Sequence, residues 1–534
     1  MKLFRRILPL FILPLLILSF SPQTVSAADI PTFDISRYQV EGNTILPVAE
    51  VERILMPFAG KRSDFGVLQQ AVEALEEAYR NLGFHAVKVV LPEQELKGGV
   101  VKLNIIEVRI GTVAVDGNKY FDKDNIRNSL LQLKEGTVPN LDRISMSIRV
   151  ANENPSRKTQ MTLHGGDSED KTNALLKVVD DKLWKIGTTL DNTGNSETGD
   201  LRLALQAQYA NLFNMDHLLT FQYTTSPAHW NDVNIYNLGY RIPLYRLGDS
   251  LDLYGGYSDV DSGTVSVQTS GGEAGINVSG KGTFAGIRYN QNLLRIGSYE
   301  HRILYGVDYR LFENNIDFAG TPLGTSTASH PFNIGYSGSY AFRTGTELSL
   351  WSTLSQNIPG GANGGKSDYE KIRIDAPPTF TVLRAGTDIR ISLPADIQTR
   401  LNLNGQYATV PLIPGEQFGV GGESSLRGFD ERELTNDYGF STTFEIYSPN
   451  ILKLFSLTES RLNALAFLDS AVLGRNKSQP GEIDNMNAAS TGVGLRLVVA
   501  NNIAASFDYA FVITPEGKRE MGDSRSHFRV QFNF

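Results

Sequence analysis

One arginine and one aspartate have the residue types and the setting for a defined interaction. The segment GGESSLRGFDERE is too rich in glycine and charge to be a strand, yet it sets Arg427 between Leu426 and Phe429. Downstream, the strand-like segment NALAFLDSAVL carries Asp469. An arginine and a carboxylate that meet away from bulk water form a charge-assisted, often bidentate ion pair. The alternative is a solvent-exposed Arg427 and an Asp469 that only lines a polar wall, and the residues alone leave both interpretations open.

Other residue patterns that would carry chemistry are weak. The seven histidines are never spaced for a shared metal site, and the chain has no cysteine. No nucleophile motif is present, and neighbouring carboxylates such as Asp180 and Asp181 are typical of solvated turns. The sequence GGANGGKS, residues 360–367, matches the phosphate-binding loop, but its flanks predict neither the strand nor the helix which that loop needs. The sequence therefore predicts no enzyme, no cofactor and no metal site.

The N-terminus predicts export. Residues 1–27 have three cations, an apolar run from Ile7 to Phe20 and a small-residue cleavage site, as in a secretory signal peptide. Removing them changes the formal net charge from −8 to −11 (−8 − 3), which argues against nucleic acid as a partner. No later apolar run reaches the roughly 18 residues of a spanning helix. The exported chain is then a soluble protein or a membrane β-barrel, whose strands hide their hydrophobicity by alternation.

An internal repeat occupies the chain before about residue 185. YQVEGN ends at Asn43 and VAVDGN ends at Asn118, a separation of 75 residues (118 − 43). Each phrase reads as a strand that ends in a Gly-Asn turn, and each is followed by two helical patterns and two strand patterns. The expected helices are residues 48–56, about 64–82, 124–133 and 141–151. The two β-α-α-β-β modules are expected over residues 34–108 and 109–185.

The remaining sequence, residues 190–534, alternates between apolar and polar residues. The C-terminal segment HFRVQFNF sets four apolar residues against four polar ones, as in a strand between lipid and a wet lumen. A soluble β-sandwich alternates in the same way, but the signal peptide, the length of the region and the terminal aromatic favour the barrel. With about 10 residues per strand and about as many per connection, the region predicts a transmembrane barrel of roughly 16 antiparallel strands. In that barrel Phe467 and Asp469 face the lumen, and Leu468 faces lipid.

These segments together resemble the two-partner secretion outer-membrane transporters of the haemolysin secretion type. SSLRGFDE is similar to the [VI]-R-G-[FY] tip of their inward-folded loop, and FLDSA is similar to their F-x-D-x-G wall motif; Leu426 and Ala471 depart from these patterns. The repeats resemble POTRA domains, NENPSRKTQMTLHGG resembles the second POTRA, and DNTGNSETG resembles the first barrel strand and turn. The site residues that the resemblance implies are Leu426, Arg427, Gly428 and Phe429 at the loop tip, with Arg427 paired to Asp469 beside Phe467 on the barrel wall.

The resemblance implies a transporter in the cell outer membrane with its N-terminal modules in the periplasm. The POTRA modules would bind an unfolded exoprotein of the adhesin or haemolysin type, and the barrel would secrete it without ATP. The other implied partners are outer-membrane lipids and the outer-membrane assembly machinery, which would recognise the C-terminal strand ending in Phe534. An assembly insertase and a passive porin are the alternatives. The short interval between the signal peptide and the first strand leaves no room for a plug helix, so the inward loop would be the main obstruction.

Overall fold

The computed structural model divides the chain into two compact units. The first unit holds residues up to 82 and residues 87–107, and the second holds residues 83–86 and all residues from 108 onward. The described residues are 32–534 without 196–197, 232, 260–263, 270–271, 278–280, 314–316, 319–320, 323–325, 344, 456–458 and 501. The predicted signal peptide, residues 1–27, therefore lies outside them. Among the described residues, no helix is both long and apolar enough to cross a membrane.

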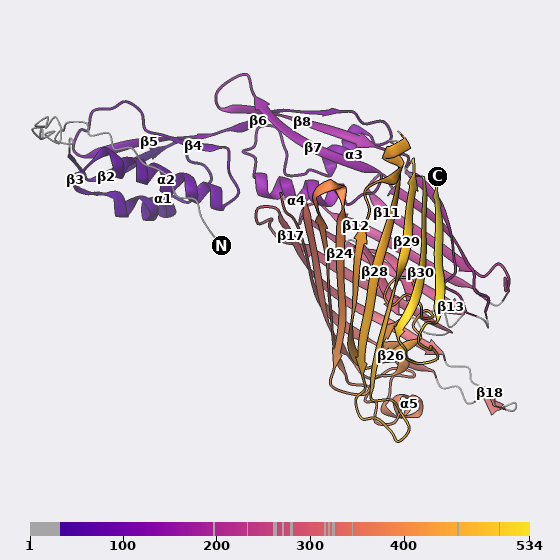
Figure 1. The fold of residues 1–534 in the computed structure, drawn as a ribbon. Coiled ribbons are helices and arrows are strands. Elements are labelled where there is room, and N and C mark those ends of the chain that lie inside the picture. The colour runs from indigo at the N-terminus through magenta and orange to yellow at the C-terminus, as the bar shows by residue number, and fades with distance from the viewer. Residues whose placement is uncertain are drawn as a thin grey trace, which may run out of the picture. The chain divides into compact units, whose positions relative to one another are not determined.

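The first unit is a β-α-α-β-β module (Figure 1). Its three-stranded sheet has the order β2-β5-β4, in which β2 runs parallel to β5 and β4 runs antiparallel to it. Helix α2 begins after Asp64, whose carboxylate accepts a hydrogen bond from the Val67 amide, and it buries one apolar face. Its elements are β1 Phe33–Ile35, β2 Arg37–Glu41, α1 Val48–Leu55, η1 Met56–Phe58, β3 Gly60–Ser63, α2 Phe65–Asn81, β4 Val87–Val90 and β5 Val100–Glu107.

The second unit starts with a module of the same topology, with sheet order β6-β8-β7. Its elements are β6 Arg109–Asp116, α3 Lys123–Asn128, α4 Leu141–Asn152, β7 Arg157–Gly165 and β8 Lys171–Asp180. Helix α3 is shorter than the expected 124–133. The residues after it are held instead by β6, because the Gly136 amide donates to the Ile110 carbonyl (2.7 Å) and Glu135 accepts from the Val113 amide (3.1 Å). Leu130 and Leu133 still enter the module's core from turns.

The repeated Gly-Asn phrase has the same structural role in both modules. Gly42 (φ +84°) and Gly117 (φ +87°) adopt the left-handed conformation, and a Cβ at either would lie 2.2 or 2.4 Å from a carbonyl oxygen of the third sheet strand. The Asn43 and Asn118 side chains each donate a 2.8 Å hydrogen bond to a carbonyl three residues later. Glycine is therefore required where the turn crosses the sheet, which explains why the phrase recurs.

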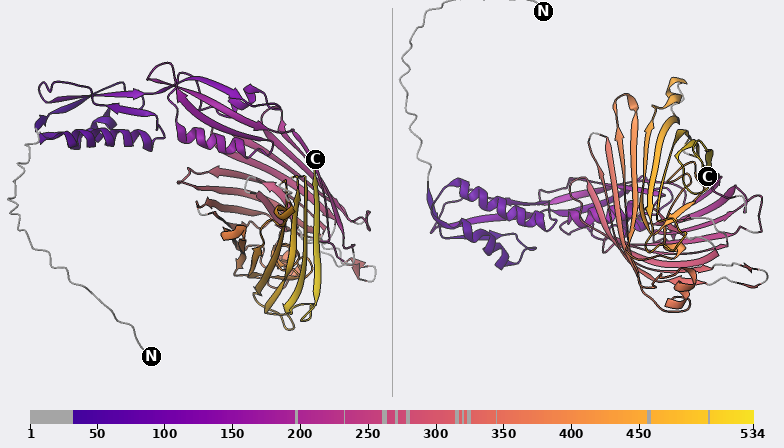
Figure 2. Two further views of the ribbon diagram at one scale, coloured as in Figure 1. Left: turned by 45° about the horizontal axis from the view of Figure 1, so that its top comes forward. Right: turned by 60° about the horizontal axis from the view of Figure 1, so that its bottom comes forward.

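The rest of the second unit is a closed antiparallel barrel (Figure 2). Its ring contains seventeen described strands, of which β20 and β21 share one position between β17 and β22, so the barrel has sixteen positions, as predicted. The ring strands are β9 Trp184–Asp191, β10 Arg202–Leu212, β11 His217–Thr225, β12 Ile235–Leu244, β13 Asp249–Asp259, β16 Lys281–Asn292, β17 Tyr299–Glu313, β20 Thr327–Ser329, β21 Pro331–Ala341, β22 Thr346–Asn357, β23 Thr381–Ser392, β24 Gln398–Ala408, β27 Tyr438–Tyr447, β28 Ser460–Gly474, β29 Asn485–Val499, β30 Ile503–Thr514 and β31 Ser524–Asn533.

Shorter elements lie in the connections. They are β14 Thr264–Thr269, β15 Gly272–Asn277, β18 Asp317–Phe318, β19 Thr321–Pro322, α5 Lys366–Ile372, η2 Pro394–Asp396, η3 Pro414–Glu416, β25 Phe418–Val420, β26 Leu434–Asn436 and η4 Ile451–Phe455. The first barrel strand begins at Trp184, ahead of the expected start at residue 190. The sequence does not show this start clearly, because polar Thr188 interrupts the apolar outward series that begins with Trp184 and Ile186.

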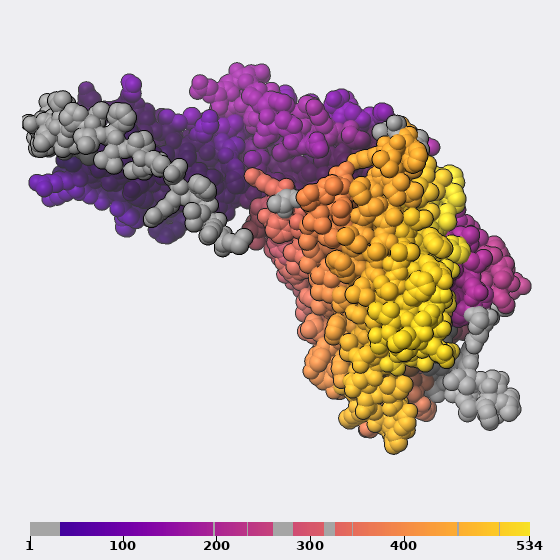
Figure 3. Space-filling view, viewed as in Figure 1, coloured from indigo at the N-terminus to yellow at the C-terminus, as the bar shows by residue number. Residues whose placement is uncertain are grey.

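The barrel wall has an apolar outer face and a polar inner face. On β27, Phe440, Phe444 and Ile446 are exposed, whereas the alternate residues Ser441 and Thr443 are buried against the interior. The strands from β24 onward form the orange-to-yellow outer surface in Figure 3. Alternation of this kind places lipid-facing and lumen-facing side chains on opposite sides of one strand. The same alternation explains why the wall residues of the site described below point inward.

The glycine-rich sequence GGANGGKS differs from its expectation. Strand β22 ends shortly before it, and helix α5 begins at Lys366 within it, so the interpretation that no strand and no helix flank it is wrong. Seven residues are too few to show a helical period in the sequence. The helix buries Tyr369, whose hydroxyl donates to the Ala328 carbonyl (3.0 Å) and whose ring packs in a cluster with Phe312 and Phe380. This segment therefore packs against one end of the barrel wall.

Candidate functional site

The connection between β24 and β27, residues 409–437, folds into the barrel. Its hairpin of β25 and β26 leads to a tip at which Leu426 and Phe429 are fully buried. Both side chains pack in one apolar cluster with Ala471, Leu473 and Val512, which belong to β28 and β30. Because these wall residues face inward, the tip lies inside the barrel.

Arg427 is held by acids from three strands. Its Nε and Nη2 donate to the two carboxylate oxygens of Asp469 on β28 (2.7 and 2.8 Å), and its backbone amide donates to the same carboxylate (3.1 Å). Its Nη1 donates to Glu445 on β27 (2.8 Å) and lies 3.7 Å from Asp508 on β30. The guanidinium also stacks 3.4 Å above the centre of the Phe467 ring. All five residues are buried, and each of the three guanidinium nitrogens donates to a carboxylate.

Two further arginines balance the acids. Asp508 receives a bidentate pair from Arg496 (2.8 and 2.8 Å), and Glu445 receives Arg400 (3.2 Å) and the Tyr447 hydroxyl (2.7 Å). Buried ions are tolerated only when they are paired and hydrogen-bonded. Each of the three acids around the loop tip is therefore paired with at least one arginine, and Arg400 is shared with Asp388 (2.6 Å).

Gly428 lets the tip turn toward the last strand. Its φ of +96° lies in the left-handed region, and its amide donates to Nε2 of His527 on β31 (3.0 Å). A Cβ at Gly428 would find Ala510, Val512 and Ser490 atoms at 3.5–3.6 Å, which is ordinary contact distance. The requirement for glycine here therefore comes from backbone conformation and not from lack of space.

The structure brings the expected loop and wall residues together. Arg427 meets Asp469 and Phe467, while Leu426 and Phe429 serve as its apolar neighbours. Ala471 is accommodated, since its methyl is part of the cluster that receives the tip.

Sequence reasoning missed the other partners of the tip. They are Glu445, Asp508 and His527, each buried at an inward position of its strand. The available signal was a charged or imidazole side chain at an inward position between apolar outward ones, as in Phe444-Glu445-Ile446. That signal gives the direction of a side chain but not the strand it will meet.

A second polar cluster joins the second module to the barrel. Arg157, the first residue of β7, pairs bidentately with Asp216 in the turn between β10 and β11 (2.7 and 3.2 Å) and donates to Asn125 of α3 (2.6 Å). Arg157 and Asp216 are almost completely buried. Burial raises the pKa of Tyr245 well above its ordinary value, so its hydroxyl stays protonated and donates to Asp216.

These features define a class of protein. A closed barrel of antiparallel strands, β-α-α-β-β modules ahead of it, and an inward loop whose arginine binds acids of the wall belong to an outer-membrane POTRA-barrel transporter. The chain belongs to the haemolysin secretion/activation family ShlB/FhaC/HecB, whose family model matches residues 170–497. Residues 33–107 also match the ShlB-type POTRA domain.

Individual relatives agree with the family. The chain is 24% identical over 515 residues to the heme/hemopexin transporter protein HuxB of Haemophilus influenzae, with 92% of this chain and 85% of HuxB covered. It is 23% identical over 494 residues to the outer membrane transporter CdiB of Escherichia coli, with 91% and 80% covered. The fold is similar to CdiB structures from Escherichia coli (TM-score 0.74, 20% identity, 97% and 93% covered) and Acinetobacter baumannii (0.70, 17%, 94% and 90%).

The predicted family, fold class and location are thereby confirmed. The protein is a two-partner secretion transporter of the outer membrane, and its N-terminal modules lie in the periplasm.

Proposed function

We propose that the periplasmic modules bind an unfolded exoprotein of the adhesin or haemolysin type and that the barrel secretes it without ATP. The modules proposed for this step are residues 34–108 and 109–185, with the barrel following. Each module's sheet ends in edge strands, β2 and β4 in the first and β6 and β7 in the second, within the described residues. An extended polypeptide can add to such an edge through main-chain hydrogen bonds. Folding of the exoprotein outside the cell would make its return unfavourable and so drive export.

The observation that carries this proposal is the inward loop. It lies beside a cavity of about 630 Å³ inside the barrel, lined on one side by loop residues such as Phe418 and Ser424 and on the other by β16, β17 and β21–β24. A loop that crosses a barrel interior limits what passes through it. We propose that the Arg427 network sets the loop's position and thus the path left for the exoprotein.

The surface of the barrel suggests two further partners, outer-membrane lipids and the outer-membrane assembly machinery. Its outward residues include Leu205, Phe221, Leu238 and Phe444, which are exposed in the isolated chain and suit contact with outer-membrane lipids. We propose that the assembly machinery recognises the last strand, β31, which ends beside Phe534.

The proposed role of Arg427 is tested by Arg427→Ala. The change leaves Asp469 and Glu445 without their shared cation, and breaking a buried pair in this way costs about 3–5 kcal/mol. We expect weaker secretion of the exoprotein while the barrel remains inserted, measured as exoprotein in the medium at equal transporter abundance. Lys281→Ala is the control, because Lys281 on β16 pairs with Asp259 on the neighbouring wall strand β13 (3.0 Å). Normal export by Arg427→Ala would contradict the role given to the loop.

A further inference from the structure

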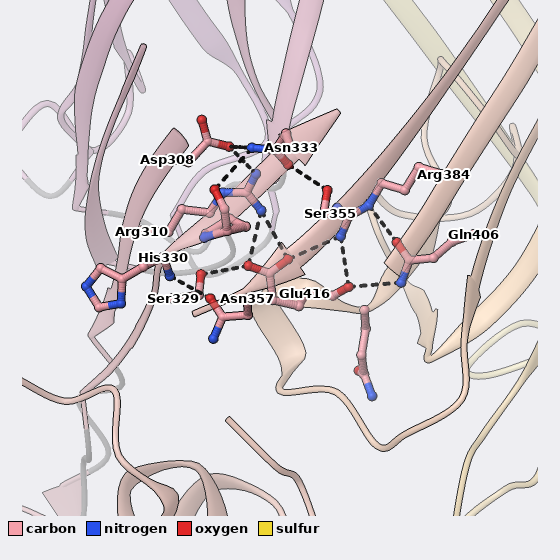
Figure 4. Close-up of polar contacts among 12 residues, drawn as sticks. Asp308, Arg310, Ser329, His330, Asn333, Ser355, Asn357, Arg384, Gln406 and Glu416 are labelled. Carbon is pink, nitrogen blue, oxygen red and sulfur yellow. Dashed lines mark hydrogen bonds and ion pairs between the residues drawn. The ribbon is translucent and has the colours of Figure 1, made fainter. Parts of the chain in front are cut away.

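A second charged cluster holds the inward loop at its root. Glu416, in the short helix η3 at the start of the loop, is 1% exposed and accepts hydrogen bonds from three wall residues. Arg310 on β17 donates from Nη1 to both carboxylate oxygens (3.1 and 3.0 Å), Ser329 on β20 donates to one (2.8 Å), and Arg384 on β23 donates to the other (3.2 Å). Figure 4 shows the carboxylate between these residues. None of these residues is among the site residues predicted from the sequence.

The wall residues of this root cluster are themselves fixed. Arg310 also donates to Asp308 (2.7 Å), which accepts from Asn333 (3.1 Å), and Ser355 donates to Asn333 (2.6 Å). Gln406 on β24 accepts from Arg384 (2.8 Å) and donates to the Glu416 carbonyl (2.9 Å). Figure 4 follows this chain from β17 to β24. Besides Glu416, Arg310 is thus bonded to Asp308 and Arg384 to Gln406, and both partners belong to the wall.

The root of the loop also packs tightly against the wall. A Cβ at Gly415 would lie 2.3 Å from a ring carbon of Phe312 on β17, so the loop backbone rests directly on that ring. Leu412 and Ile413, the residues before η3, are buried in the same apolar cluster as Phe312. Apolar packing as well as ion pairing therefore holds the root against β17.

The two clamps of the loop have opposite polarity. At the tip the loop supplies the cation, Arg427, and β27, β28 and β30 supply the acids. At the root the loop supplies the acid, Glu416, and β17 and β23 supply the cations. If Arg427 and Glu416 exchanged places, like charges would face each other at largely buried positions. These two clusters thus favour Arg427 at the wall of β27, β28 and β30 and Glu416 at the wall of β17 and β23, beside further pairs of the loop acids Asp430 and Glu433 with Arg519.

We propose that Glu416 is a positioning residue that clamps the root of the loop to β17 and β23, independently of the Arg427 clamp at the tip. Arg310 and Arg384 also line the cavity of about 630 Å³, together with loop residues such as Phe418 and Ser424, so displacement of the root would change the width of that cavity. The consequence for secretion rests on the function proposed above, but the position of the loop does not.

The absence of cysteine from the sequence permits a direct measurement of loop position. Two cysteine pairs carry spin labels in the full-length protein, and the distance distribution of each pair is measured by pulsed electron resonance. The root pair joins exposed Pro414 to outward-facing Leu383, and the tip pair joins exposed Ser424 to outward-facing Val493. Insertion of the barrel is verified by its heat-modifiable electrophoretic mobility.

Glu416→Gln keeps the shape of the side chain and removes its charge. We expect the root distribution to become about twofold broader while the tip distribution is unchanged, because only the root loses its charge-assisted bonds. Arg427→Gln is expected to give the reverse pattern. An unchanged root in Glu416→Gln, or broadening of both pairs, would overturn the proposal.

A second variant and a separate readout complete the test. If Glu416→Gln does not yield a folded barrel, Arg384→Gln removes one of the two cations, and an unchanged root pair in that variant also overturns the proposal. Secretion is measured in the same variants. A displaced root with normal secretion would support the clamp and contradict the function proposed for the loop.

Discussion

Arg427 and Gly428 are neighbours in the loop tip, yet they act through different physical properties. Arg427 acts through its side chain, whose planar fork reaches two acids while its face covers Phe467. Gly428 acts through its backbone, since a φ of +96° turns its amide toward His527. The position of the tip therefore depends on the charge of Arg427 and on the absence of a side chain at Gly428.

Gly428→Ala is expected to weaken secretion through backbone strain. An alanine in the left-handed region costs about 1–2 kcal/mol, and its methyl would itself fit at 3.5 Å from its neighbours. The backbone would relax and lose the bond to His527. Gly481 is the matched control, with a similar φ of +91° and no atom within 4 Å of its Cβ. Secretion at equal transporter abundance should fall for Gly428→Ala only, and an equal effect of both variants would show that the tip has no special role.

At the scale of elements, a fully buried ion pair joins the second module to the barrel, beside the pair of Glu153 with Arg302 (3.1 Å). Arg157 begins strand β7, and Asp216 lies in the turn that joins β10 to β11. The neighbouring Asn154 adds a bond from its side chain to the Ala210 carbonyl at the end of β10 (2.6 Å). The Asn-Pro-Ser-Arg segment thus joins the module to the first hairpin of the barrel.

Arg157→Ala is expected to loosen the second module from the barrel. It leaves Asp216 buried without its cation, at a cost of about 3 kcal/mol, so the segment between β8 and β9 should become more accessible to protease. Limited proteolysis of the purified protein measures this as an increased cleavage rate. The double variant Arg157→Ala/Asp216→Ala removes both charges and should cleave more slowly than Arg157→Ala alone. Equal rates for the wild type and Arg157→Ala would show that the pair does not hold the module.

At the scale of the whole molecule, the barrel is closed between its first and last strands. Residues 187–191 of β9 pair with residues 529–533 of β31, and the backbones of Ile186 and Phe534 extend this pairing. The Phe534 ring itself is 74% exposed. The backbone bonds of Phe534 can therefore be tested separately from its ring.

Phe534→Ala separates the recognition of the last strand from closure of the barrel. The backbone bonds to Ile186 remain, so the purified barrel should unfold within about 0.5 kcal/mol of the wild type. If the assembly machinery reads the terminal aromatic, the amount of heat-modifiable barrel in outer membranes should fall. Deletion of Phe534 also removes the backbone bonds and should lower both quantities. Normal membrane insertion of Phe534→Ala would contradict recognition through this ring.

Local sequence patterns determined much of the architecture. The Gly-Asn phrases mark the turns at Gly42 and Gly117, because only glycine tolerates their conformation and the nearby carbonyl oxygens. Alternation marked the barrel strands and the inward direction of Asp469, since a strand has a period of two. Where the period was short, as in β9 and α5, the expectation failed. Arg427 and Asp469 were found as candidates because their residue types and setting are unusual for a loop and a wall.

Only the tertiary structure decided which side chains meet. Glu445, Asp508 and Arg310 are ordinary charged residues in the sequence, and closure of the barrel places them around the loop that carries Arg427 and Glu416. Their partners lie up to 106 residues away along the chain, as for Arg310 and Glu416. Local patterns set the face on which a residue lies, but barrel closure and the path of the loop set its distance from every other strand. That is the physical reason why the residues alone left the Arg427–Asp469 pair as one of two interpretations and gave no sign of the root clamp.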